Sequence, residues 1–152
     1  MSTRAIAWLK QRKISHEVVF YDHAEKGAAF AAQAVGFPLA RTVKTLVVDL
    51  GGCAFGLALM PGDRELALKK AAKAFGVKKA AMAAVEAAER LTGYHPGGIS
   101  PFGLRHRLPA VMEEGLLAFE TVMINGGRRG VMLKMAPGDI VAVLWCQTVS
   151  LI

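Results

Sequence analysis

The clearest feature in the pattern of hydrophobic and polar positions is a pair of apolar runs that predicts a β-hairpin. Residues 42–50 and 53–60 are rich in β-branched and other apolar side chains, and Gly51-Gly52 joins them. A Gly-Gly dipeptide suits a tight primed turn, in which both central residues need a positive φ. The first half of the domain is therefore predicted to contain a two-stranded antiparallel unit.

A second hairpin and several helices complete the pattern. Gly126-Gly127 separates residues 121–125 from residues 129–135, which again have strand character. Further strands are predicted at residues 16–22, 108–112 and 147–152. Apolar residues at helical spacing predict helices at residues 3–12, 28–35, 64–75, 83–91 and 137–145. Hairpins interleaved with helices predict an α+β fold, with a mixed, mainly antiparallel sheet and flanking helices.

Local signals mark the start of two predicted helices, and no signal marks a domain boundary. Asp63 is expected to cap the helix at residues 64–75, and Pro137 begins the helix at residues 137–145. No repeat, linker or low-complexity tract interrupts the series. A chain of 152 residues is long enough to bury a core of its own. Residues 1–152 are therefore predicted to form a single domain.

Composition and charge narrow the possible partners. Hydrophobic residues make up 53% of the chain and charged residues 20%, a globular balance with no apolar run long enough to span a membrane. No secretory signal is recognisable, so we expect a cytoplasmic protein. Cys53 and Cys146 are expected to be reduced thiols, and no metal or organic cofactor is indicated. The net charge of +7 favours a polyanionic partner, although solvated lysine-rich helices explain such a charge equally well.

The stretch from Thr92 to Gly103 has the composition of a rigid binding loop. It holds four glycines and two prolines, together with aromatic residues that a passive linker lacks. Glycine permits positive φ and close approach of the backbone to a ligand, while proline stiffens the chain. The exposed amides of such a loop suit a small polar or anionic group.

Lys44 is a charged residue inside an apolar strand pattern. One interpretation is an edge-strand lysine that discourages aggregation. The other is a cation directed into a cleft, where an ammonium group would suit a phosphate or a developing oxyanion and would act with the amides of Gly97 and Gly98.

Other candidate groups give weaker signals. His23 follows Tyr21-Asp22 at the end of a predicted strand, but no partner for a catalytic base is identifiable. Ser100 lies in Gly-Ile-Ser-Pro and not in a nucleophile elbow, so its hydroxyl is interpreted as a hydrogen-bonding group of the loop or of a ligand. Residues 126–130 are either an anion-binding nest or a hairpin turn with two exposed arginines.

Several of these motifs together resemble the YbaK/prolyl-tRNA-editing family in order and spacing over nearly the whole chain. The motifs are Lys44-Thr-Leu-Val47, Thr92-Gly-Tyr94, Gly97-Gly-Ile-Ser-Pro101, Gly126-Gly-Arg-Arg-Gly130 and Pro137-Gly-Asp139. The resemblance implies an α/β fold with a mixed sheet and a free-standing deacylase acting on mischarged tRNA(Pro), with Cys-tRNA(Pro) or Ala-tRNA(Pro) as substrate. It implies tRNA as the partner, with prolyl-tRNA synthetase as a further one, and neither a membrane nor DNA.

Carried over by position, the resemblance implies roles for individual residues. Lys44 matches the functional lysine at the acceptor end, and Gly98 would offer its amide to the ester carbonyl. The expected substrate-binding residues are Tyr21, Gly97, Ile99, Ser100, Pro101 and Asn125. The basic residues expected to meet tRNA phosphates are Lys69, Lys70, Lys73, Arg128 and Arg129. An activated ester needs no protein nucleophile if water, backbone donors and the substrate's own hydroxyls are well placed.

Two departures from the family pattern leave the edited amino acid open. Cys-editing members resemble one another in having Ser and Asp where this chain has Asn125 and Met132. Methionine offers only a weak sulfur acceptor, so alanine is as plausible a substrate side chain as cysteine. The alternative function is a non-catalytic protein that binds a tRNA acceptor end or a nucleotide with the same loop.

Overall fold

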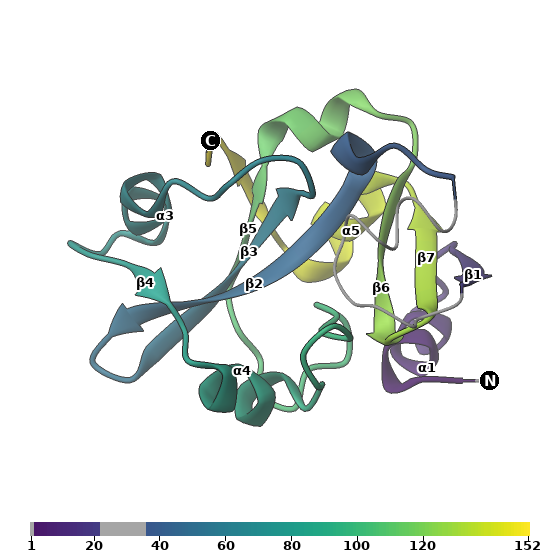
Figure 1. Ribbon diagram of the computed structural model, residues 1–152, viewed down its shortest axis with the longest axis horizontal. Helices are drawn as coiled ribbons and strands as arrows, with labels where there is room; N and C mark the ends of the chain where they lie inside the picture. The colour runs from purple at the N-terminus through teal and green to yellow at the C-terminus, as the bar shows by residue number, and fades with distance from the viewer. Residues whose placement is uncertain (1, 22–35) are drawn as a thin grey trace.

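The computed structural model describes residues 2–21 and 36–152, and its centre is one mixed β-sheet (Figure 1). The strands follow the order β1-β7-β6-β2-β3-β5-β8, with β4 paired to β2 off this path. The strand bounds are β1 Glu17–Phe20, β2 Thr42–Gly51, β3 Ala54–Pro61, β4 Ala81–Met82, β5 Ala110–Glu113, β6 Val122–Arg128, β7 Val131–Met135 and β8 Gln147–Val149.

Antiparallel pairs predominate among the strand pairs that the structure describes. β2–β3, β2–β4, β6–β7 and β1–β7 are antiparallel, whereas β2–β6, β3–β5 and β5–β8 are parallel. The predicted fold class, a mixed and mainly antiparallel sheet with flanking helices, is confirmed. The parallel pairs arise because helices and long connections return the chain to the same end of the sheet.

Helices cover both faces of the sheet. The helix bounds are α1 Arg4–Gln11, α3 Leu68–Phe75, α4 Val85–Thr92 and α5 Pro137–Leu144, with 3₁₀ helices η1 Leu39–Arg41 and η2 Glu114–Ala118. α1 and α5 pack with Val43 and Ile124 in the main core cluster, and α4 packs on Val47 and Leu57 of the same face. α3 packs on the opposite face, against Val48 and Ala58.

Capping residues explain where these helices begin and end. The hydroxyl of Thr3 accepts a hydrogen bond from the Ile6 amide at 3.1 Å at the start of α1. Gly76 and Gly93 end α3 and α4 in the left-handed conformation, with φ of 70° and 81°. Pro137 occupies the first turn of α5, as predicted, because its fixed φ suits that position.

The structure corrects three local predictions and adds elements that the pattern did not predict. α3 begins at Leu68 and not after Asp63, since the Arg64 amide bonds to Pro61 in a turn and the Ala67 amide bonds to Leu151. The turn of the first hairpin is Gly52-Cys53 and not Gly51-Gly52, since Gly51 ends β2 and pairs with Ala54. The turn of the second hairpin is Arg129-Gly130, and Gly126-Gly127 lies inside β6. β4, η1 and η2 were not predicted. The helix predicted at residues 28–35 lies outside the described residues, as does His23.

Candidate active site

The candidate site lies where two parallel strands separate. β2 and β6 pair through Thr42–Met123 and Val43–Ile124 and then diverge. In Figure 1 the loop that follows α4 lies between the lower parts of these two strands. This loop is the Gly-rich loop of residues 92–103, which the sequence singled out. The divergence therefore places a glycine-rich backbone at the carboxyl-terminal side of a parallel strand pair, a common location for ligand sites in open sheets.

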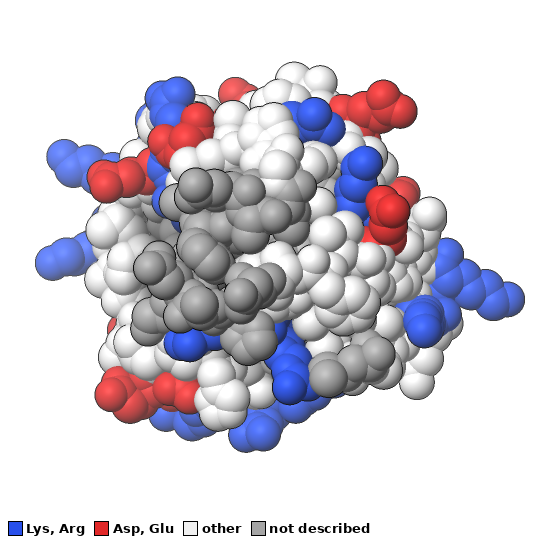
Figure 2. Space-filling view, turned by 45° about the vertical axis from the view of Figure 1, so that its right-hand side comes forward, with Lys and Arg blue, Asp and Glu red and all other residues white. Residues whose placement is uncertain are grey.

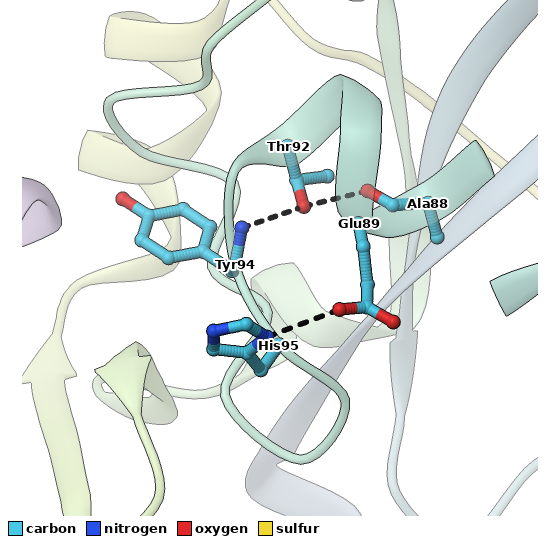
Figure 3. Close-up of polar contacts among 5 residues, drawn as sticks. All are labelled: Ala88, Glu89, Thr92, Tyr94 and His95. Atoms are coloured by element: carbon cyan, nitrogen blue, oxygen red, sulfur yellow. Dashed lines mark hydrogen bonds and ion pairs between the residues drawn. The ribbon is translucent and has the colours of Figure 1, made fainter. Parts of the chain in front are cut away.

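Side chains from both ends of the Gly-rich loop hold it closed. The Thr92 hydroxyl donates to the carbonyl of Ala88 at 2.7 Å and accepts from the Tyr94 amide at 3.1 Å (Figure 3). The hydroxyl of Tyr94 donates to the carbonyl of Phe102, across the neck of the loop. The Arg105 amide returns to Thr92 O at 3.1 Å. The loop is thus a compact structure with its ends tied together, as the sequence predicted for a rigid segment.

Tyr94 is the buried support of the loop. Its side chain is 6% exposed, and burial raises the pKa of its phenol to about 12 despite the opposing charge of Arg4. The guanidinium of Arg4 lies 5.7 Å from the ring centroid. A Cβ on Gly127 would come within 2.9 Å of the Tyr94 ring, so the β6–β7 hairpin rests directly on this tyrosine. The supporting roles of Thr92, Tyr94 and Arg4 were not predicted.

Asn125 joins the hairpin to the loop. Its Oδ1 accepts hydrogen bonds from the amides of Gly127 at 2.7 Å and Arg128 at 3.1 Å, which caps the bulge in β6. Its Nδ2 donates to the carbonyl of Gly97 at 3.1 Å. Asn125 was expected to bind substrate, and the structure gives its amide group three protein partners. Both lone pairs of Oδ1 are thereby used, and one donor hydrogen of Nδ2 remains beyond these three bonds.

The two loop glycines have different surroundings. Gly97 is exposed, with a φ of 83° that favours glycine. Gly98 is buried, and a Cβ there would meet the backbone of Arg128 at 3.0 to 3.2 Å. Its amide donates to the carbonyl of His95 at 2.9 Å. In this conformation the Gly98 amide therefore has a protein acceptor, and contact with an ester carbonyl would require it to leave or share that bond.

Lys44 lies in a central strand, which excludes the edge-strand interpretation. β2 is flanked by β3 and β6, and Lys44 pairs with Met60 of β3. Strand alternation and the pairing of β2 with β6 place Lys44 on the same sheet face as Asn125. Met132 is the direct cross-strand partner of Asn125, so both positions that depart from the Cys-editing pattern lie side by side.

Tyr21 joins this face from the other end of the sheet. It packs with Val19 against Met123 and Met132, and its amide bonds to Gly130 O at 3.0 Å. The structure therefore brings Tyr21, Asn125 and Lys44 to one face, with Gly97 hydrogen-bonded to the central residue of the three.

The remaining loop residues of the prediction are directed into the protein. Ser100 has no exposed surface, and its hydroxyl accepts from the Phe102 amide at 3.3 Å. Ile99 packs into the core beneath α4, and Pro101 is buried beside a different hollow that contains Trp8. The loop uses these three side chains to anchor itself, and their contact with a substrate stays a prediction.

The five predicted tRNA-binding residues fall into two separate groups. Arg128 and Arg129 are exposed and line a hollow of about 330 Å³ together with His95, Pro96 and Gly98. Lys69, Lys70 and Lys73 are exposed on α3, at the opposite side of the molecule from the β6–β7 turn in Figure 1. Lys70 also bonds to Ser150 Oγ at 3.2 Å and to the carbonyl of Ile152.

The arginine group borders the Gly-rich loop. Figure 2 shows Lys and Arg side chains gathered along the lower edge of the molecule, at the height of the β6–β7 turn and α1 in Figure 1. His95 at the same hollow is 92% exposed and pairs with Glu89 at 3.0 Å (Figure 3). Two exposed arginines thus line a hollow next to the predicted acyl-binding loop, and arginine is a residue type suited to an anion.

The described residues give no sign of a metal centre or a membrane span. Within residues 2–21 and 36–152, no cluster of three or more His, Cys, Asp or Glu side chains has metal-binding geometry. No helix in that part of the chain is long and apolar enough to cross a bilayer.

Comparison with known proteins identifies the family. The model of the aminoacyl-tRNA editing domain matches residues 23–143. The proposed Cys-tRNA(Pro)/Cys-tRNA(Cys) deacylase EbsC of Enterococcus faecalis is 32% identical over 143 residues, which cover 93% of this chain and 87% of that protein. A proline–tRNA ligase of Trichlorobacter lovleyi is 36% identical over 89 residues, which cover 59% of this chain and 16% of the ligase.

A solved structure shows the same fold. The crystal structure of a proposed trans-editing enzyme for prolyl-tRNA synthetase superposes with a TM-score of 0.89 and 32% identity, covering 97% of this chain and 94% of that one. Together with the matched domain family, this similarity means that the chain belongs to the aminoacyl-tRNA editing domain family.

Proposed function

We propose that this protein is a free-standing aminoacyl-tRNA deacylase that hydrolyses the ester of mischarged tRNA(Pro). The observation that carries the proposal is the placement of Lys44 on the face of Asn125, where β2 and β6 separate around the Gly-rich loop. The names of the relatives, a Cys-tRNA(Pro) deacylase and a trans-editing enzyme for prolyl-tRNA synthetase, support tRNA(Pro) as the substrate. The reaction belongs to translation, and we place it in the cytoplasm.

Lys44 is the residue that we propose to act on the acceptor end. Lys44 is partly buried in a central strand, where an anion is the natural partner of its ammonium group, and the acceptor end supplies phosphate and a developing oxyanion. Arg128 and Arg129 would hold a neighbouring phosphate at the hollow beside Gly98. The exposed backbone of Gly97 and the side chain of Tyr21 would border the aminoacyl group.

The proposed reaction needs no protein nucleophile. An aminoacyl ester is already activated, so a water placed against its carbonyl, with Lys44 stabilising the oxyanion, is sufficient. With cysteine as the aminoacyl group, the substrate thiol itself can attack the ester carbonyl and release the tRNA hydroxyl. Met132, which lies buried beside Asn125, makes the surroundings of the amino-acid side chain largely apolar. Such surroundings suit alanine as well as cysteine, so the assay includes both.

The test is release of amino acid from Cys-, Ala- and Pro-charged tRNA(Pro) by the wild type and by Lys44→Ala. We expect release of Cys or Ala with Pro spared, and a loss of about 100-fold in the variant, as for removal of one oxyanion donor. Lys78→Ala, which removes an exposed lysine beyond α3, is the matched control and should retain full activity. Release at the spontaneous rate by the wild type would refute the deacylase.

Two further outcomes would redirect the proposal. Binding of uncharged tRNA(Pro) without release would favour the alternative, a non-catalytic protein that binds the acceptor end. Release from several tRNAs by the isolated protein, narrowed to tRNA(Pro) when prolyl-tRNA synthetase is added, would make the synthetase the source of tRNA selectivity. The partial match to a proline–tRNA ligase is the reason to include the synthetase in the assay.

A further inference from the structure

Trp145 is a large aromatic side chain that the fold holds out into solvent. It is 81% exposed and follows α5 in the left-handed conformation, with a φ of 56°. Glycine usually occupies this position after a helix, because other side chains are strained there. An exposed tryptophan in a strained backbone position gains little from the core, which makes a binding role the first hypothesis to consider.

Hollows lie on both sides of Trp145. One, of about 360 Å³, extends to Trp8 and Arg12, and the other, of about 670 Å³, extends to Phe75. Trp145 and Arg107 line both hollows. We call the two hollows together the Trp145 groove. It runs past the residues that precede β5 and β8, on the side of the Gly-rich loop where Pro101 is buried.

The groove combines aromatic rings with positive charge. Arg107 is exposed, and the guanidinium of Arg12 lies 3.8 Å from the centroid of the Trp8 ring. Trp8 is itself stacked on Phe102 at a centroid distance of 5.8 Å, so this platform is fixed by the core. No Asp or Glu is among the described residues that line either hollow. Such a lining favours an anion that also carries flat rings over an uncharged protein surface.

We propose that the Trp145 groove is a second RNA-binding site, which holds a single-stranded segment of tRNA. Trp145 stacks on an unpaired base, and Arg107 and Arg12 contact the phosphates on either side of it. Sites for single-stranded nucleic acid combine these two kinds of group, because every base has a flat face and every linkage a negative charge. The choice of tRNA as the RNA rests on the proposed function, whereas the groove itself contains neither Lys44 nor Asn125.

The test measures binding of uncharged tRNA(Pro), a short unpaired oligoribonucleotide and a duplex of the same length. Trp145→Gly removes the ring at a position that suits glycine, so the fold is retained. We expect it to weaken binding of tRNA and of the unpaired strand about tenfold or more, and Trp145→Phe to restore most of the affinity. Arg107→Gln should lower the slope of log affinity against log salt by about 0.7.

Control variants and the choice of probe keep the outcomes separate. Met82→Ala truncates an exposed side chain on β4, 48% exposed and outside the groove lining, and should bind RNA like the wild type. Equal affinity of Trp145→Gly and the wild type would overturn the proposal, as would a preference for the duplex. Loss of self-association or of protein binding in Trp145→Gly, with RNA binding unchanged, would also overturn it.

Because uncharged tRNA carries no aminoacyl ester, its binding can be measured whether or not the protein is a deacylase. If the protein releases amino acid but binds RNA equally well without Trp145, the proposed RNA-binding role of the groove is refuted and the proposed deacylase activity is not. Trp145-dependent binding without any release would refute the deacylase alone.

Discussion

Replacement of Asn125 should separate the stability of the site from its chemistry. Asn125→Ala removes three hydrogen bonds, two accepted from the amides of Gly127 and Arg128 and one donated to Gly97 O. A protein hydrogen bond contributes about 0.5 to 1.5 kcal/mol net, and these are partly exposed, so the lower part of that range applies. The expected loss is about 2 kcal/mol, or a fall in Tm of about 4 to 8 °C for a domain of this size.

Asn125→Asp separates two roles of the three bonds, capping of the β6 bulge and attachment of the hairpin to Gly97. A carboxylate still accepts from both amides of the β6 bulge, but it cannot donate to Gly97 and instead places a negative charge against that carbonyl. We therefore expect the aspartate variant to lose less stability than Asn125→Ala. Deacylation should nevertheless fall in both variants, because the Gly-rich loop loses its tie to the hairpin.

The assay is urea unfolding of both variants together with amino-acid release from charged tRNA(Pro). Gln11→Ala, which truncates an exposed amide side chain at the end of α1, is the control for handling and should match the wild type. A loss below about 0.5 kcal/mol in Asn125→Ala would refute the structural role. Full activity of Asn125→Asp would show that the bond to Gly97 does not position the loop.

Two further predictions concern the buried side chains of Tyr94, which supports the Gly-rich loop, and Glu113, which accepts a hydrogen bond from Leu151 near the end of the chain. Tyr94→Phe leaves the Phe102 carbonyl without its donor and should cost about 1 to 3 kcal/mol by urea unfolding. The phenol pKa of about 12, raised from its ordinary value of 10.0, means that stability falls as pH rises from 10 toward 12; this part of the pH dependence should vanish in the variant. Glu113→Gln leaves one carbonyl oxygen for the amides of Gly115 and Leu151, so we expect a loss of about 1 to 3 kcal/mol, and equal unfolding midpoints would contradict it.

The fold class and the first hairpin followed from local pattern alone. The flanking runs pair as predicted, but the turn lies one residue later than expected, at Gly52-Cys53, with φ of 57° and 65°. The second hairpin shows where local pattern is insufficient. Gly126-Gly127 satisfied the same turn rule, yet the Asn125 side chain caps two amides there and makes the pair a bulge. A side chain that competes for backbone donors leaves no signal in hydrophobic periodicity.

The residue types singled out from the sequence are partly brought together by the fold. Asn125 bonds to Gly97 of the Gly-rich loop, and Lys44 lies on the sheet face of Asn125, while their roles in a site stay predictions. For Ser100 the sequence left a loop role and a ligand role open, because a hydroxyl in a glycine-rich stretch has the same appearance in either; in the structure it is buried and bonds within the loop. Likewise, exposed lysines on α3 and arginines on the hairpin are equivalent by charge, and only the tertiary fold separates them.

The separation of β2 from β6 explains why such different residues converge. In a continuous ladder the backbone groups beyond Val43 and Ile124 would pair with each other, and a charge at Lys44 would lie against a neighbouring strand. Where the strands diverge, Asn125 supplies partners for two backbone amides, and the carbonyl of Gly97 accepts from it in turn. The residue that satisfies the backbone groups left by this break in the sheet is therefore also the one that joins the hairpin to the Gly-rich loop.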